Sequence, residues 1–147
     1  EQNDRKSEIV SEIMGQLKEW FGLPEVNARL AAEAAGKPMW TAWRGDRPVG
    51  FVTLNINSRW SAELDVLGVV REEQRKGIGA GLVSAAEEYL KKGGIQYLAL
   101  KTLADSDTHE GFIHTRAFYR KMGFVSLMDL PTLWNAENPC LIMVKKI

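Results

Sequence analysis

The sequence predicts an α/β protein in which a central mixed β-sheet is flanked by helices. Apolar residues recur at helical spacing near the start of the chain, as they do in an amphipathic helix. Short apolar runs bounded by Gly, Pro or polar residues indicate strands. The resulting order is helix, helix, three strands, helix, strand, helix, two strands, which is typical of a mixed sheet covered by helices. The 147 residues suffice for one core, so we expect one domain over residues 1–147.

The first half of the chain should supply two helices and three strands. The apolar face of the first helix is made by Ile9, Val10, Ile13, Met14, Leu17, Trp20 and Phe21. Gly22 and Pro24 are expected to end this helix. The predicted elements are a helix over about 5–21, a shorter helix over about 24–33, strands over 39–44 and 49–55, and a central strand from Ser61 to about Val70.

The second half should supply two helices and three strands. A long helix follows the central strand and closes at Gly93 and Gly94, and Gly123 is the expected cap of a later, shorter helix. The predicted elements after the long helix are a strand over 97–103, a polar loop over 104–111, a helix over 115–122, a strand over 124–130, a loop over 131–139 that holds Trp134, and a strand over 141–145.

Composition narrows the classes of partner and site. The 19 basic and 19 acidic residues cancel, which argues against a nucleic-acid partner because such proteins normally carry a basic surface. The apolar runs fall short of membrane-spanning length. The single cysteine, Cys140, rules out an internal disulfide framework, and no Cys/His cluster suggests a metal. We therefore expect a soluble cytoplasmic protein without a metal or a membrane partner.

The stretch from Ser61 to Gly81 predicts a ligand. It reads as a strand, a polar turn and then glycines that open a helix. Such a turn points free backbone N–H groups at one spot, and the helix dipole adds positive charge there, so a phosphate or pyrophosphate binds well. Gly77 and Gly79 would allow close approach of that ligand. Their spacing matches neither the G-x-G-x-x-G fingerprint nor a P-loop.

Two blocks in this order resemble the GNAT superfamily of N-acetyltransferases. The first is Gln74-x-x-Gly77-x-Gly79 after a strand ending Leu-Gly-Val-Val, and it resembles that superfamily's acetyl-coenzyme A signature. The second runs from Ala117 to Phe124 and resembles its later helix-to-strand element. The resemblance implies the GNAT acyl-CoA N-acyltransferase fold, with acetyl-CoA as co-substrate.

The resemblance also implies where acetyl-CoA binds. The end of the central strand, Leu67 to Val69, would splay away from the strand at Ala99 to Lys101, with Gly68 suited to a bulge, and the pantetheine arm would pair with the exposed backbone. The N–H of Val69 would act as an oxyanion donor. The expected coenzyme-binding residues are Leu67, Gly68, Val69, Gln74, Arg75, Lys76, Gly77, Ile78, Gly79, Ala80, Phe118 and Lys121.

Tyr119 is the expected acid, since the matching tyrosine of the family protonates the leaving thiolate. A phenol near pKa ~10 gives its proton to a thiolate whose acid is near ~8.5 at a cost of only ~2 kcal/mol. Packing of the ring beside Phe118 is the alternative role.

Glu63 is the candidate base. Strict alternation would place Glu63, Asp65, Leu67 and Val69 on one face of the central strand, where the two carboxylates would attract an ammonium group. Proton transfer from an alkylammonium to an ordinary carboxylate is uphill by about 8 kcal/mol. The residue would therefore position the amine, work through water, or lie where its protonated form is favoured. A solvent-facing acidic edge is the alternative.

The acceptor is the least determined part of the prediction. Trp20, Phe21, Leu23 and Trp134 could wall an acceptor pocket, or they could be core or homodimer contacts. The paired acids favour a small primary amine as the acceptor over a protein or peptide. A non-catalytic acyl-CoA sensor and a transfer-RNA acetylating enzyme are the other hypotheses, and the neutral charge argues against the latter.

Overall fold

The computed structural model describes residues 5–147. Its elements are α1 (Lys6–Gly15), α2 (Pro24–Ala34), β1 (Met39–Arg44), β2 (Arg47–Ile56), β3 (Ser61–Val69), α3 (Ile78–Lys92), β4 (Tyr97–Leu103), α4 (Glu110–Lys121), β5 (Val125–Asn135) and β6 (Asn138–Lys146). The strands form one sheet in the order β1-β2-β3-β4-β6-β5. β3 and β4 run parallel and the other neighbours are antiparallel, so the predicted mixed sheet is confirmed.

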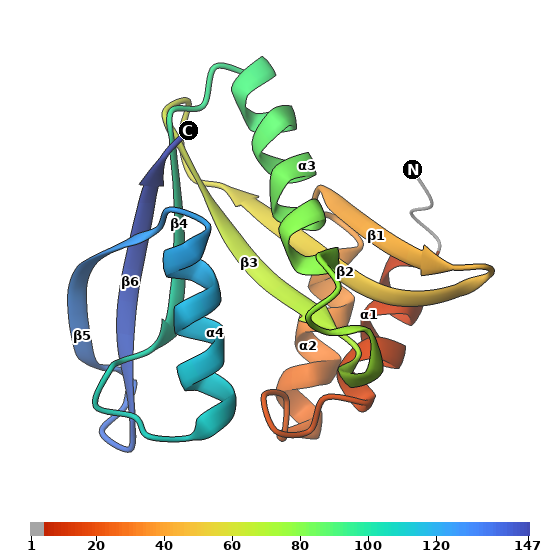
Figure 1. Cartoon of the computed structure of the whole chain (residues 1–147), viewed down its shortest axis with the longest axis horizontal. Helices are drawn as coiled ribbons and strands as arrows, with labels where there is room; N and C mark the ends of the chain where they lie inside the picture. Colours follow the sequence, from red (N-terminus) through yellow and green to blue (C-terminus); the bar gives the residue numbers. More distant parts are fainter. Residues whose placement is uncertain (1–4) are drawn as a thin grey trace.

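Helices cover both faces of this sheet (Figure 1). On one face, α3 packs through Leu82, Val83, Ala86 and Leu90, and Tyr119 of α4 belongs to the same apolar cluster. On the other face, α1 and α2 pack against β2 and β3 in a second apolar cluster. The sheet therefore separates two compartments, which we call the α3/α4 face and the α1/α2 face.

The faces of β3 exchange at Asp65, which contradicts the strict alternation expected for this strand. Thr53 of β2 pairs with Val66 and the next residue, Leu54, pairs with Leu64, so Asp65 is an extra residue in the ladder. Ala62 and Leu64 pack with α3 before this bulge, whereas Val66 packs with α1 after it. A bulge shifts every later side chain to the opposite face.

Glu63 and Asp65 therefore do not share a face with Leu67 and Val69, as alternation had predicted. Leu67 and Val69 pack against the cluster that contains α3, while Asp65 bonds to Lys37, which follows α2. Gly68 is also not the bulged residue, because it pairs regularly with Phe51. A Cβ on Gly68 would lie 3.1 Å from Phe51 Cε1 and 3.4 Å from Leu17 Cδ1, so the missing side chain lets α1 approach the strand.

β3 and β4 separate where the bulge begins. Their pairing runs from Ser61↔Tyr97 to Leu64↔Leu100 and stops there. The predicted splay is thus present in the second half of both strands, although Ala99 and Leu100 still belong to the paired part. Figure 1 shows the two strands side by side at the top of the view and diverging below. We call residues 65–69 and 101–103 the fork, and the pair Leu64↔Leu100 its apex.

Three predicted boundaries were wrong. α1 ends at Gly15 rather than near Phe21, because the chain turns with Leu17 N–H bonded to Met14 O and Phe21 N–H bonded to Leu17 O. α4 begins at Glu110, within the expected polar loop.

β5 continues past residue 130 to Asn135, so Trp134 lies in a strand and not in a loop. The tight connection to β6 explains the length of β5, since Asn135 Oδ1 accepts hydrogen bonds from the N–H groups of Glu137 and Asn138. None of the helices within residues 5–147 is both long and apolar enough to cross a membrane.

The packing at Gly68 gives a stability test. Gly68→Val should lower the free energy of unfolding by about 1–3 kcal/mol, because the new side chain overpacks the contact with Phe51 and α1. Gly81→Ala is the matched control: its Cβ would meet nothing within 4 Å, and alanine is favoured in a helix by about 1 kcal/mol, so stability should rise. Urea unfolding of the ligand-free protein measures both. A Gly68→Val protein as stable as the parent would contradict the close approach of α1.

Candidate functional site

The turn between β3 and α3 exposes a set of unused backbone donors. A 3-10 turn at Arg71–Glu73 is followed by Arg75 with φ 64° and Gly77 with φ 84°. The first α3 hydrogen bond recorded at this end runs from Gly81 N–H to Gly77 O, which leaves the preceding amides without an intrahelical acceptor. No side chain of residues 5–147 caps this helix. The arrangement suits an anion such as a pyrophosphate.

Side chains fix the turn to the sheet. Gln74 Nε2 donates to the carbonyl of Val69 at 2.9 Å, which ties the turn to the end of β3. Glu73 is buried and accepts from Arg44 of β1 at 2.6 Å, while Lys76 Nζ lies 3.5 Å from the same carboxylate. The hydrogen bond from Arg44 lowers the pKa of Glu73 below its usual value, so this carboxylate stays charged and keeps the turn anchored.

Phe118 connects the turn to α4. A Cβ on Gly79 would lie 3.2 Å from Phe118 Cζ, so the glycine provides room for that ring. Gly77 is required for its positive φ instead, because a Cβ there would meet nothing within 4 Å. Tyr119 follows on the same helix, with its ring centroid 5.5 Å from that of Phe118 and 5.9 Å from that of Phe124. The structure thus brings Gly79, Phe118 and Tyr119 together on the α3/α4 face.

Burial makes Tyr119 a weaker acid than a free phenol. Its side chain is 9% exposed, and desolvation raises the pKa of Tyr119 to about 12. The hydroxyl therefore stays protonated throughout the neutral range and can donate a hydrogen bond.

The two acids of β3 are each paired with a lysine, which the sequence did not predict. Lys101 Nζ lies 3.0 Å from Glu63 Oε2, and Lys37 Nζ donates to Asp65 Oδ2 at 2.6 Å. Glu63 and Lys101 are close because Glu63 pairs with Ala99 in the parallel ladder, and Lys101 lies two residues further on. The pairing could have been predicted only from the register between the two parallel strands. The charges of these two carboxylates and two lysines sum to zero. The acids therefore do not form an unpaired acidic pocket that could attract a cation.

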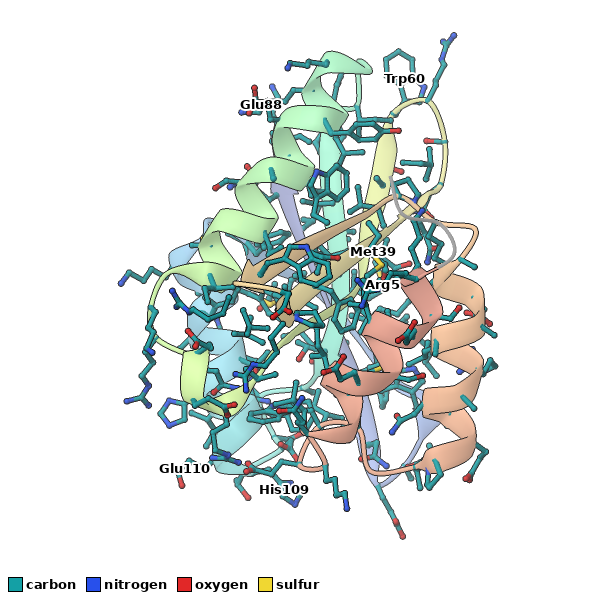
Figure 2. The ribbon with its side chains drawn as sticks, turned by 90° about the vertical axis from the view of Figure 1, so that its right-hand side faces the viewer. Arg5, Met39, Trp60, Glu88, His109 and Glu110 are labelled. Carbon is teal, nitrogen blue, oxygen red and sulfur yellow. The ribbon has the colours of Figure 1, made fainter. Side chains whose placement is uncertain are left out.

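Arg116 was also missed, and it positions the loop before α4. Its guanidinium is buried and donates to the carbonyl oxygens of Leu103 at 3.0 Å and Asp107 at 2.8 Å. Its Nε lies 3.3 Å from Asp105 Oδ1. Figure 2 shows His109 and Glu110, at the end of this loop, at the opposite end of the molecule from Trp60 and Glu88. Arg116 is thus the structural partner of the loop that contains Asp105 and Asp107.

Comparison with protein families decides the identity of this fold and site. The model of the acetyltransferase (GNAT) family matches residues 6–124. The chain belongs to the GNAT family. Members of this family are acetyl-CoA-dependent N-acetyltransferases, so the protein is an enzyme of that class. Comparison with curated proteins gave no match.

Solved structures have the same fold. A GNAT-family protein from Desulfovibrio desulfuricans superposes with a TM-score of 0.82 at 18% identity, over 97% of this chain and 92% of that one. An aminoglycoside 6'-N-acetyltransferase complexed with coenzyme A gives 0.77 at 20% identity, over 95% and 89%. The ribosomal-protein-S18-alanine N-acetyltransferase of Escherichia coli gives 0.75 at 17% identity, over 96% and 87%. These neighbours include enzymes for small molecules and for a protein, so the fold leaves the acceptor class open.

Other candidate residues of this GNAT chain fall in different places. Trp20 lies in the connection after α1, and a Cβ on Gly111 would lie 3.0 Å from its Cζ2, so the ring packs on the first turn of α4. Leu23 is 59% exposed and Trp134 46% exposed on β5. Lys121 is exposed in the last turn of α4. Cys140 is buried, which raises the pKa of its thiol and agrees with an inert side chain.

The acidic, histidine and cysteine side chains of residues 5–147 were compared for a metal-binding arrangement. Within residues 5–147, no group of three or more His, Cys, Asp or Glu residues is arranged to hold a metal ion.

Replacing Arg116 tests its role in holding α4. Arg116→Met should lower the free energy of unfolding by about 3 kcal/mol, because it leaves the carbonyl groups of Leu103 and Asp107 without their donor and removes the buried cation beside the Asp107 carboxylate. Arg120→Ala removes an exposed ion pair with Asp105 and should cost about 1 kcal/mol or less. Urea denaturation compares the two, and equal losses would refute the buried network.

The ionisation of Tyr119 should be visible in alkaline solution. Its folded pKa of about 12 exceeds the free value of about 10, so its contribution to stability is intact below pH ~10 and is lost as pH rises toward 12. Tyrosinate absorbance of the parent minus that of Tyr119→Phe should rise only near pH 12 or with unfolding. A difference signal that titrates near pH 10 in the folded protein would contradict the burial of this phenol.

Proposed function

We propose that this enzyme transfers acetyl from acetyl-CoA directly to the primary amine of a small molecule. The observation that supports it most is the fork between β3 and β4. It opens beside the anion-binding turn on one face of the sheet and beside Glu63 on the other. A donor and an acceptor could thus approach one point from opposite faces, without an acyl-enzyme intermediate.

The coenzyme would lie on the α3/α4 face. The amides from about Arg75 to Ala80 would hold its pyrophosphate, with Arg75 and Lys76 adding positive charge nearby. The pantetheine arm would run along the separated edge of β3 at Leu67, Gly68 and Val69, and Phe118 would line it.

The remaining coenzyme contacts are proposed for the turn and the end of α4. They comprise Gln74, Gly77, Ile78, Gly79 and Lys121.

A backbone donor would stabilise the oxygen of the thioester carbonyl. Val70 N–H donates to Val49 of β2 at 2.9 Å, so the alternation of the strand directs the N–H of Val69 toward the fork. Beyond the apex, β4 does not pair with that edge. Val69 N–H is therefore the proposed oxyanion donor, and Leu67 N–H has the same direction.

Tyr119 would assist departure of the CoA thiolate. With a pKa of about 12, full proton transfer to a thiolate whose acid is near ~8.5 would be uphill by ~5 kcal/mol. The phenol is therefore best suited to donate a hydrogen bond that strengthens as negative charge gathers on sulfur. The departing proton of the amine can then reach the sulfur through this group or through water.

Glu63 would position the acceptor amine on the α1/α2 face. The side chain of Glu63 is 15% exposed, and that of its partner Lys101 is 40% exposed. An incoming ammonium group can therefore displace the lysine. Trp20 packs between the cluster of α1 and α2 and the first turn of α4. The two carboxylates of β3, Glu63 and Asp65, both contact ammonium groups of lysines, which supports a small amine as the acceptor.

The test of this function is an amine panel with acetyl-CoA, scored by release of the free thiol. Polyamines, aminoglycosides, amino acids and an N-terminal peptide represent the acceptor classes, and at least one small amine should release CoA. Acetyl-CoA should also raise the melting temperature. Stabilisation by acetyl-CoA without thiol release for any amine would favour the non-catalytic sensor, and release only with the peptide would overturn the small-molecule assignment.

Two variants should separate catalysis from coenzyme binding. Tyr119→Phe should lower kcat about tenfold or more and leave the Kd for acetyl-CoA nearly unchanged, because a donor to the leaving group acts mainly in the transition state. Gly79→Val should abolish acetyl-CoA binding, since its side chain would enter the space between the turn and Phe118. Calorimetric titration and steady-state rates separate the two effects. Unchanged turnover in Tyr119→Phe would remove this residue from the mechanism.

A further inference from the structure

Lys101 places a primary amine next to the candidate base of the enzyme. Its Nζ is 3.0 Å from Glu63 Oε2, which is the contact proposed above for an acceptor ammonium. The side chain is 40% exposed and is therefore free to change conformation. The protein thus carries, on its own sheet, the chemical group that it is proposed to acetylate.

The fork places this amine near the reactive end of a bound donor. The anion-binding turn follows the open end of the fork, so an arm running inward from the turn meets the apex, where β3 and β4 are hydrogen-bonded at Leu64↔Leu100. The arm cannot pass between paired strands, so its thioester would lie in the fork, between Val69 N–H, the proposed oxyanion donor, and the apex. Lys101 is the first residue of β4 beyond that apex.

Lys101 also lies on the correct side of the sheet for an acceptor. Leu98 and Leu100 pack with α3, so the alternation of β4 directs Lys101 to the α1/α2 face, where it meets Glu63. Donor and lysine would therefore approach the fork from opposite faces, as the proposed reaction requires.

We propose that the enzyme acetylates its own Lys101 when acetyl-CoA is bound and no acceptor amine is present. This inference rests on the proposed function. Lys101 first gives a proton to Glu63 or to water, and the neutral nitrogen attacks the thioester carbonyl. A C–N bond forms and the C–S bond breaks. CoA leaves as the thiolate and takes up a proton, and Nε-acetyl-lysine remains. The modification removes the positive charge that neutralises Glu63.

Mass spectrometry tests this directly. Purified enzyme is incubated with acetyl-CoA alone, and the acetylated lysines are mapped and timed. Lys92, which is 77% exposed on α3 and ion-paired with Glu88, is the internal reference for uncatalysed acetylation. Lys101 should be modified about tenfold faster than Lys92 or more, because it is held near the donor. The first-order rate constant should not depend on enzyme concentration.

Three controls separate an enzymatic step from chemical acetylation. Excess free CoA should slow modification of Lys101 and leave Lys92 unaffected. Gly79→Val should have the same effect, and the CoA competition remains informative if that variant does not fold. Lys101→Arg should abolish the rapid acetylation, because the guanidinium keeps the positive charge opposite Glu63 but is not a nucleophile.

The outcomes also separate this inference from the proposed function. If the amine panel releases thiol but Lys101 is modified no faster than Lys92, self-acetylation is overturned and the proposed function stands. If acetyl-CoA neither binds nor supports transfer to any amine, both are overturned. Fast modification of Lys101 that free CoA suppresses supports the inference.

Discussion

The extra residue at Asp65 is the constraint on which the site depends. In a regular ladder Leu67 and Val69 would share the face of Glu63 and Asp65. Glu63 and Asp65 face the α1/α2 side, and the bulge turns the later residues Leu67 and Val69 to the α3/α4 face. One strand can then present carboxylates to one compartment and free backbone to the other. Separation of β3 from β4 beyond the apex connects those compartments.

Side-chain contacts with the sheet hold the turn between β3 and α3 in place. Gln74 bonds the end of β3, and Glu73 bonds Arg44 across β2 on β1. These contacts use side chains, so the amides of the turn remain available. Donors already fixed in place do not have to be ordered when a ligand binds, and this lowers the entropic cost of binding. The turn can thus be both well ordered and unoccupied by protein groups.

The sequence predicted the turn, the mixed sheet and the bounds of β4, because glycine spacing and apolar runs are local signals. It missed the bulge at Asp65, since alternation along one strand does not reveal the register of its neighbour. It missed Arg116 for a related reason: burial of a charge depends on carbonyl groups that the fold delivers. The lysine partner of Glu63 came from a parallel register that no single segment contains.

Pairing of Glu63 with Lys101 also changes what the acidic residues can do. Two unpaired carboxylates would attract any polycation, whereas a paired carboxylate binds an ammonium only by exchanging one cation for another. The exchange is close to neutral in charge, so affinity must come from the shape and hydrogen bonding of the acceptor. Under the proposed function, specificity would then reside in the surfaces around the α1/α2 face. Acetylation of Lys101 would remove the competing cation and leave Glu63 free for an external amine.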